Sequence, residues 1–336
     1  MSKHIKGVTI SQVADAAGVA RSSVSRAFTR PEMLSPETVN RIMAAADQLG
    51  YRPNHTARAL STGRYGNIAL IVPDIANPFF PPMIRAAQMQ ADSANFCIFL
   101  GNTEENGEKE DQLIGRFTGQ VEGLILASPR LSDERIWAHA EKLPLVLINR
   151  DIPGISSVLI DSSVGVAEAV THLAKLHHRK MVYISGPPVS WSNRQRQEAF
   201  DKTALALGVE TATVPTLRPD FESGRKAVEA MLATGATAGI AFDDLTAQGV
   251  LTGLAERGIS VPADFSLIGC DDVLGSVTYP ALTSISSQSS EAGQAAIALL
   301  LEMLQTSKHA DLRHMIATHL VVRNTTREPH SAVTSG

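Results

Sequence analysis

The stretch Ile10–Phe28, ISQVADAAGVARSSVSRAF, has the apolar spacing of two short helices joined by a tight turn. Gly18 lies at the join, where two helices that cross at a steep angle need a residue that tolerates positive φ. The residues expected to hold the pair together are Val13, Ala14, Ala17, Val19, Val24 and Ala27. The pattern predicts a helix-turn-helix, with a plain helical hairpin as the alternative.

A third helix is predicted from Pro36 to Leu49. Ser35 is expected to cap its first turn, Pro36 suits the first helical position, and Gly50 ends it. Its expected apolar face consists of Val39, Ile42, Met43, Ala46 and Leu49. Three short helices around one small core can present the second helix outward.

The outer face of that second helix carries Arg21, Ser22, Ser25 and Arg26. A helix fits the major groove of B-DNA, where an arginine can bind a guanine through two hydrogen bonds. The alternative is a solvated face with two arginines by chance. Residues 1–64 hold nine Lys and Arg against four Asp and Glu, whereas the remaining 272 residues hold 21 against 30. A basic leader on an acidic body indicates a local contact with a polyanion.

The remaining whole-chain features concern compartment and metals. Cys97 and Cys270 lie in apolar runs and are expected to be buried thiols of a reducing compartment. The opening MSKHIKGVTI lacks an apolar signal-peptide core, and no run of about 18 apolar residues occurs. We therefore expect a cytoplasmic protein with no membrane partner. His172, His177 and His178 are expected to be surface and helix-end residues, so no metal and no cofactor are predicted.

From Asn67 onward, short apolar runs alternate with amphipathic stretches. The runs are NIALIVP, FCIFLG, EGLILAS, PLVLIN, KMVYISG, AGIAFDD and FSLIGCDD. Runs of this length predict buried parallel strands with helices on both faces of the sheet. Seven such strands suit two linked α/β lobes, with the chain crossing between them at Val158–Asp161, near Leu282–Ser287 and after a helix over Glu291–Leu304.

Polar and aromatic side chains follow several of these strands. Ligands of such folds bind outside the carboxyl ends of the strands. Arginines and carboxylates can hold paired hydroxyls through two-point hydrogen bonds, and sugar faces lie on aromatic rings. A lone aspartate after a parallel strand is often only a helix cap, which is the alternative for Asp244 and Asp272. Recurrence at many strand ends favours a carbohydrate site.

Two stretches, TISQVADAAGVARSSVSRAF and LSPETVNRIMAAADQLGYRPNHTARALSTG, resemble the DNA-binding headpiece of the LacI–GalR family of bacterial transcription regulators. The shared motifs are V-A-x-x-A-G-V, V-S-R and L-G-Y-x-P-N-x-x-A-R-x-L. The resemblance implies base contacts from Arg21, Ser22, Arg26 and Leu60, and phosphate contacts from Thr9, Ser23, Ser25 and Asn54. Ala20 departs from the family, which usually has a Ser or Thr there that caps the recognition helix and can contact phosphate.

The segment RPNHTARALSTG, at residues 52–63, allows two readings. It is either a basic linker or a hinge helix that is too short to be stable alone. In the family that it resembles, such a helix orders only on operator DNA, and the two copies of a dimer meet in the minor groove. Leu60 would then be the side chain that wedges open the central base step.

The body resembles the effector-binding core of the same family, itself like a periplasmic sugar-binding protein, and the resemblance spans residues 8–328. The positions that it implies for effector binding are Asp74, Phe79, Arg150, Asp161, Trp191, Arg196, Phe221, Asp243 and Asp271. The chain departs at Ser287, where many members carry a glutamine, and Gln288 beside it is expected to point elsewhere. The C-terminal RNTTREPHSAVTSG lacks a leucine heptad, which favours a dimer over a tetramer.

The predicted fold class is α/β, with a helix-turn-helix headpiece, a hinge helix and a two-lobe core of parallel sheets like a periplasmic binding protein. The predicted limits are 1–52 for the headpiece, 53–64 for the hinge, 65–160 plus 288–318 for one lobe, 161–287 plus 319–328 for the other, and 329–336 for a tail.

The predicted function is a repressor that binds a pseudo-palindromic operator as a homodimer and is controlled by a sugar or sugar derivative bound between the lobes. A periplasmic-type sugar-binding protein is disfavoured by the basic headpiece and the missing signal peptide. An α/β enzyme is disfavoured because the motifs G-x-G-x-x-G, G-x-x-x-x-G-K-[ST] and G-x-S-x-G do not occur.

Overall fold

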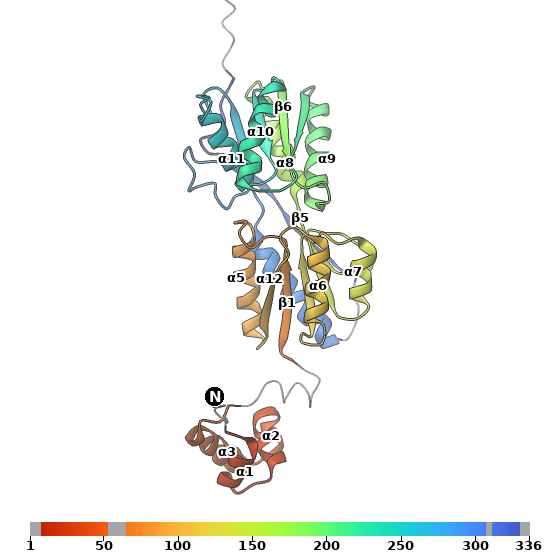
Figure 1. Ribbon diagram of the computed structural model, residues 1–336, viewed down its shortest axis with the longest axis vertical. Helices are drawn as coiled ribbons and strands as arrows, with labels where there is room; N and C mark the ends of the chain where they lie inside the picture. The colour runs from red at the N-terminus through yellow and green to blue at the C-terminus, as the bar shows by residue number, and fades with distance from the viewer. Residues whose placement is uncertain (1–7, 53–64, 307–310, 330–336) are drawn as a thin grey trace, which may run out of the picture. The chain divides into compact units, whose positions relative to one another are not determined.

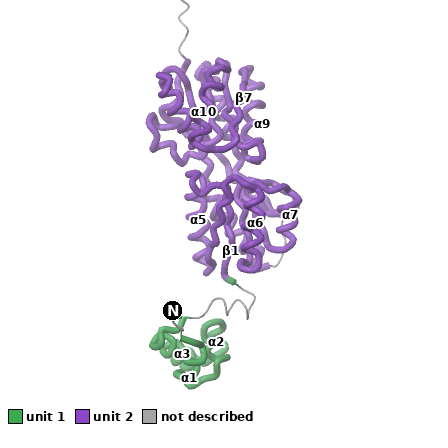
Figure 2. The backbone as a smooth tube through the Cα atoms, viewed as in Figure 1, with its two compact units in different colours: residues 1–65 green, residues 66–336 purple. Residues whose placement is uncertain are grey.

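The computed structural model describes residues 8–52, 65–306 and 311–329. The chain divides into two compact units, residues 1–65 and residues 66–336 (Figure 2). Each unit has its own hydrophobic core, and each is considered by itself. Among the described residues, no helix is long and apolar enough to cross a membrane.

In its described residues, 8–52 and 65, the first unit contains three α-helices. They are α1 (Ile10–Ala17), α2 (Arg21–Thr29) and α3 (Pro36–Leu49), with a 3-10 turn η1 (Pro31–Met33) before α3. The expected helix ends are confirmed, because Gly18 and Gly50 take left-handed φ angles of 62° and 67°. Ser35 caps α3 by accepting from the Thr38 N–H, whereas Ala20 gives α2 no side-chain cap. The helix-turn-helix prediction is therefore confirmed.

The core of this unit is small, which limits what α3 can bury. Val13, Val24 and Ile42 are fully buried at its centre. Met43 and Leu49 were expected on the apolar face of α3, but they are 44% and 39% exposed. That expectation was wrong because the two short helices opposite α3 cover only a narrow stripe of it.

The described part of the second unit contains two six-stranded sheets (Figure 1). The first, in the order β11-β5-β4-β3-β1-β2, has β1 (Asn67–Val72), β2 (Cys97–Asn102), β3 (Gly123–Ala127), β4 (Leu145–Ile148), β5 (Ser157–Asp161) and β11 (Arg313–Ala317). The second, in the order β12-β10-β9-β8-β6-β7, has β6 (Lys180–Ser185), β7 (Glu210–Pro215), β8 (Ala238–Ala241), β9 (Ser266–Asp271), β10 (Thr283–Ser286) and β12 (His319–Val321). Among the described strands, neighbours pair in parallel except β10 and β12.

Helices cover both faces of each sheet (Figure 1). The first sheet carries α5 (Phe80–Ser93) and α12 (Ser289–Thr306) on one face, and α6 (Gly107–Phe117) and α7 (Asp133–Ala140) on the other. The second carries α8 (Ser162–Lys175) and α9 (Trp191–Ala206), and opposite them α10 (Phe221–Ala233) and α11 (Asp244–Ala255). We call the first sheet with its helices the N-lobe and the second the C-lobe.

The chain passes between the lobes where β5 leads into α8, where β10 leads into α12, and where β11 leads into β12. These passages lie where the apolar pattern predicted them. The apolar pattern missed β7, because its sequence ETATVP has no apolar run. As an edge strand it pairs only with β6 among the described strands, so Glu210, Thr211 and Thr213 can stay wholly or partly exposed without cost to the core.

Two expectations about single side chains were wrong. Cys97 is exposed, because it begins the edge strand β2, while Cys270 is buried as expected. His178 is 1% exposed rather than on the surface. Its ring contacts the Thr237 hydroxyl at 2.7 Å and the Arg327 carbonyl oxygen at 2.9 Å, and burial lowers its pKa. It therefore anchors the end of the described chain to the C-lobe.

Helices α10 and α11 approach so closely that two of their positions cannot hold a side chain. A Cβ at Gly249 would lie 2.0 Å from the Phe221 carbonyl oxygen, and one at Gly224 would lie 2.1 Å from the Thr246 carbonyl oxygen. Because the atoms opposite are backbone, a rotamer change cannot make room, and one helix would have to move.

We predict that Gly249→Ala lowers the free energy of unfolding by about 1–3 kcal/mol or more through overpacking. Gly115→Ala in α6 is the matched control, because Gly115 is exposed and nothing lies within 4 Å of its added Cβ. That change should raise stability by about 0.5–1 kcal/mol. Urea unfolding of the two variants measures both effects, and equal stability of Gly249→Ala and wild type would contradict the close approach.

Candidate DNA-contacting helix and ligand pocket

The exposed face of α2 is the candidate DNA-contacting surface in the first unit. Arg21, Ser22, Ser25 and Arg26 are exposed on it, while Val24 and Ala27 are buried against the other helices. Ser23 is half-buried. The face thus presents two guanidinium groups and two hydroxyls on a helix whose opposite side is fixed by the core.

Thr9 is the N-cap residue of α1. Its side chain accepts from the Gln12 N–H, and the Gln12 side chain accepts from the Thr9 N–H, which together form a capping box for α1. If the Thr9 hydroxyl contacts a DNA phosphate, it must do so while its oxygen accepts from the Gln12 N–H. Asn54 and Leu60 lie outside the described residues, so their expected DNA contacts stay predictions.

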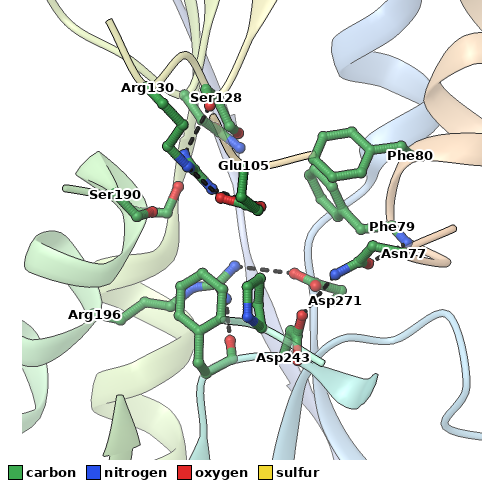
Figure 3. Close-up of a pocket in the computed structure, with 14 residues that line it drawn as sticks. Asn77, Phe79, Phe80, Glu105, Ser128, Arg130, Ser190, Arg196, Asp243 and Asp271 are labelled. Atoms are coloured by element: carbon green, nitrogen blue, oxygen red, sulfur yellow. Dashed lines mark hydrogen bonds and ion pairs between the residues drawn. The ribbon is translucent and has the colours of Figure 1, made fainter. Parts of the chain in front are cut away.

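The second unit holds a pocket where its two lobes meet (Figure 3). Its lining comes from strand ends and helix starts of both lobes: Asn77, Phe79, Phe80, Glu105, Ser128, Arg130 and Asn149 from the N-lobe, and Ser190, Ser192, Arg196, Pro219, Phe242, Asp243 and Asp271 from the C-lobe. The centre of a water molecule can move through about 30 Å³ of this pocket.

Arg196 organises the C-lobe wall from the second turn of α9. It is 4% exposed, and its guanidinium donates to Asp271 at 3.0 Å, to the Ser162 hydroxyl at 3.3 Å and to the Phe242 carbonyl oxygen. The same group lies 5.0 Å from the centre of the Phe242 ring. Burial alone would lower the pKa of Arg196, but the neighbouring Asp271 carboxylate raises it above its ordinary value, so the guanidinium stays charged.

Asp243 connects the two lobes. One carboxylate oxygen accepts from the Thr246 N–H at 2.7 Å and caps α11, and the other accepts from the Asn77 side-chain amide at 2.8 Å. Asn77 belongs to the N-lobe turn after β1, where its own carbonyl accepts from the Phe79 N–H. Burial raises the pKa of Asp243 to about 6. A single hydrogen bond thus joins a helix start of one lobe to a strand end of the other.

An ion pair forms the opposite wall (Figure 3). Arg130 donates to Glu105 through Nε at 2.5 Å and through Nη2 at 3.1 Å, and its Nη1 donates to the Ser128 carbonyl oxygen at 2.7 Å. The side chains of Arg130 and Glu105 are only 6% and 10% exposed. The rings of Phe79 and Phe80 meet edge to face, with centres 5.0 Å apart, on the same lobe.

Four lining residues have left-handed backbone although none is glycine. Their φ angles are 61° at Glu105, 48° at Ser128, 54° at Asn149 and 103° at Asp271. Such conformations cost free energy and persist where the surrounding structure enforces them, often at binding sites. Because each residue ends or closely follows a strand, they lie where ligands of this fold class bind.

Of the nine residues predicted for effector binding, the structure brings four into the pocket lining: Phe79, Arg196, Asp243 and Asp271. The other five do not line it. Asp74 accepts from the Ala76 N–H within its own turn, and Arg150 pairs with Asp133 at 2.5 Å. Asp161 caps α8, while Trp191 and Phe221 are the first residues of α9 and α10. Their roles remain predictions.

Sequence reasoning missed the ion pair of the N-lobe wall. Arg130 follows β3 in the run ASPR, so the rule about strand ends would have found it had it been applied to that strand. Asn77 lies between the predicted residues Asp74 and Phe79, and Asn149 directly precedes the predicted residue Arg150. Glu105 had no clear signal, because nothing in the run TEEN tells which of two adjacent glutamates turns inward.

Three residues close to the pocket in sequence or space, Ser287, Gln288 and Asp244, were also discussed from the sequence. Gln288 donates to the Ala317 carbonyl oxygen at 3.0 Å, outside the pocket lining, and Ser287 is buried with its hydroxyl on the Asp271 carbonyl oxygen. Asp244 is no simple cap, because its carboxylate accepts from the N–H groups of Val273 and Leu274 and from the Ser284 hydroxyl. Within the described residues, no group of three or more His, Cys, Asp or Glu could hold a metal ion.

Comparison with known proteins agrees with both parts of the structure. Residues 9–54 match the family described as bacterial regulatory proteins, lacI family, and residues 170–326 match the periplasmic binding protein-like domain. The HTH-type transcriptional regulator GalS of Salmonella typhimurium is 31% identical over 287 residues, which is 83% of this chain and 84% of that protein. The chain belongs to the lacI family of bacterial regulatory proteins.

Two solved structures match most of this chain. The lac repressor dimer bound to operator and the anti-inducer ONPF matches with a TM-score of 0.87 at 26% identity, covering 96% of this chain and all of that chain. A family member from Enterococcus faecalis with bound ribose matches with a TM-score of 0.70 at 30% identity, covering 78% and 99%. This lacI-family chain is a DNA-binding transcription regulator.

Glu110 supports the N-lobe wall of this regulator from behind. It is 2% exposed on α6, and its carboxylate accepts from the N–H groups of Arg130 at 2.7 Å and Leu131 at 3.2 Å. Burial raises its pKa from 4.5 to about 7, although the two N–H groups oppose the shift. Between pH 4.5 and 7, the Glu110 carboxyl is therefore mostly protonated in the folded protein and mostly ionised in the unfolded chain.

We predict that Glu110 makes folding less favourable as pH rises from 4.5 to 7, because the folded-state pKa lies above the unfolded one. Glu110→Gln cannot titrate, so its stability relative to wild type should increase over that window by about 2–3 kcal/mol. Urea unfolding at a series of pH values measures the difference. A difference that stays constant between pH 4.5 and 7 would show that the buried carboxyl has an ordinary pKa.

Proposed function

We propose that the chain is a repressor that binds a pseudo-palindromic operator as a homodimer and whose operator affinity is set by a sugar or sugar derivative bound between its lobes. We further propose that it acts in the cytoplasm and has no enzymatic activity. The two lobes are proposed to span 65–160 plus 288–318 and 161–287 plus 319–328. The membership of the two sheets supports these limits.

The observation that carries the DNA-binding half is the exposed arginine face of α2 on a fully formed helix-turn-helix. Arg21, Ser22 and Arg26 are proposed to contact bases, and Thr9, Ser23 and Ser25 to contact phosphates. Leu60 and Asn54 are proposed for the minor groove and a phosphate on the resemblance alone. The operator-bound lac repressor is a dimer, and two-fold symmetry in a dimer requires two half-sites in the DNA.

The effector half rests on the chemistry of the pocket. Two guanidinium–carboxylate pairs and several hydroxyl and amide groups provide two-point partners for sugar hydroxyls, and the rings of Phe79 and Phe242 provide apolar faces. The ribose-bound relative supports a sugar as the ligand class. Arg196, Asp243, Asp271 and Phe79 are the residues that we propose for direct contact.

The hydrogen bond between Asn77 of the N-lobe and Asp243 of the C-lobe supports a switching mechanism. A sugar hydroxyl that contacts Asn77 or Asp243 would replace the hydrogen bond that joins these two residues across the pocket. An effector thereby favours one arrangement of the lobes. If the operator favours the other arrangement, each ligand weakens the binding of the other by the same factor. We propose release of the operator as the outcome.

One experiment tests the DNA-binding half. Full-length protein is used to select its preferred duplex from a random pool, and we expect a pseudo-palindrome. Arg21→Ala should then lose about 1–3 kcal/mol of binding free energy on that duplex and relax the preference at one base pair in each half-site. Arg41→Ala on α3 removes the same charge from the same unit and is the control, because Arg41 does not lie on α2.

The arms of that experiment separate base contacts from phosphate contacts. Arg41→Ala should weaken binding little and equally on all duplexes. If Arg21→Ala behaves in the same uniform way, Arg21 contacts phosphate, and the proposed reading of bases by α2 is wrong. Selection of a site without two-fold symmetry would contradict the dimer.

A further inference from the structure

Two adjacent glutamates after β2 have opposite environments. Glu104 and Glu105 both take left-handed backbone, with φ angles of 56° and 61°. The Glu104 side chain is 65% exposed and pairs with Lys109 at 2.9 Å. The Glu105 side chain is 10% exposed and faces Arg130 in the pocket, while its N–H donates to the Pro73 carbonyl oxygen at 2.9 Å. The turn thus delivers one carboxylate, and only one, to the pocket wall.

Glu105 occupies the part of Arg130 that would otherwise bind an anion. The Nε and Nη2 groups form the edge of a guanidinium that matches the two oxygens of a phosphate or carboxylate. Both groups donate to Glu105, and Nη1 donates to the Ser128 carbonyl oxygen. Glu105, from the same lobe, therefore balances the charge of Arg130 and occupies the edge of the guanidinium that could bind an anion.

The remaining charged residues of the lining, Arg196, Asp243 and Asp271, also disfavour an anionic ligand. Arg196 is held by Asp271 and by the Phe242 carbonyl oxygen. Asp243 is a third carboxylate, and its partners are the neutral Thr246 N–H and Asn77 amide. The described lining thus contains three carboxylates and two guanidinium groups, and both guanidinium groups are paired. An anionic ligand would meet repulsion without a free cation, whereas hydroxyl groups could donate to the carboxylates.

We propose that Glu105 sets the charge selectivity of the pocket: by holding Arg130 in an ion pair, it restricts the effector to uncharged, hydroxyl-bearing molecules and excludes phosphorylated or acidic ones. This inference rests on the proposed function in taking the pocket as the effector site. It narrows the ligand class to unphosphorylated sugars and related polyols.

The first test uses inorganic phosphate as the probe and full-length protein. The melting temperature is followed against phosphate concentration at constant ionic strength, because a ligand that binds the folded state raises it by mass action. Glu105→Gln keeps a hydrogen-bond acceptor for Arg130 but removes the charge, and it should bind phosphate at least about tenfold more tightly than wild type. Glu104→Gln is the matched control from the same turn and should behave as wild type.

Phosphate that binds to the basic first unit contributes equally in every variant, because that unit is unchanged, so differences between variants report on the pocket. The double change Glu105→Gln with Arg130→Met should lose the gain, since the guanidinium is gone. Wild type that binds phosphate as tightly as Glu105→Gln would overturn the proposal. So would a gain that survives the loss of Arg130, because the phosphate would then lie elsewhere, or no gain in a folded Glu105→Gln protein.

The second test needs no variant and separates the inference from the proposed function. Calorimetry compares ribose with ribose 5-phosphate and glucose with glucose 6-phosphate and gluconate on wild-type protein. We expect any sugar that binds to exceed its anionic counterpart by about tenfold or more. Tighter binding of an anionic member overturns the selectivity. If no sugar binds but the phosphate results hold, the sugar effector of the proposed function fails while Glu105 still controls access of anions to Arg130.

Discussion

The buried guanidinium of Arg196 is the constraint on which the C-lobe wall of the pocket depends. It joins α9 to the start of α8 at Ser162, to the end of β8 at the Phe242 carbonyl oxygen, and to the end of β9 at Asp271. A buried charge costs several kcal/mol of desolvation unless it is paired and hydrogen-bonded, so each of these partners must stay in place. The lobe therefore presents a preorganised set of polar groups before any ligand arrives.

The two walls differ in how they can move. Each is rigid by itself, because the pair of Arg196 and Asp271 lies within the C-lobe and the pair of Glu105 and Arg130 lies within the N-lobe. Between them, the Asn77–Asp243 hydrogen bond is a neutral-donor contact that a ligand hydroxyl can replace at little cost. Rigid walls with a weak connection between them allow a small ligand to change the spacing of the lobes without disturbing their cores.

The sequence predicted what depends on local pattern and missed what depends on the exact path of the backbone. The helix-turn-helix could be predicted because its apolar spacing and its turn residue Gly18 all lie within a stretch of about twenty residues. The pocket could be placed at the strand ends, but Arg150 was chosen there and Arg130 was overlooked, although both follow buried strands. The direction of Glu105 depends on two consecutive left-handed residues, and the adjacent Glu104 carries the same chemistry in the opposite direction.

We propose that an effector in the pocket and an operator at the DNA-contacting helix compete through the arrangement of the lobes. The most direct test of this competition measures the affinity of the effector, once the sugar panel has supplied one, for the free protein and for the protein saturated with its selected operator. We expect the operator to weaken effector binding by a factor of about 5–150, and the effector to weaken operator binding by the same factor. Equal affinity of the effector for the free and the operator-bound protein would contradict the proposed competition.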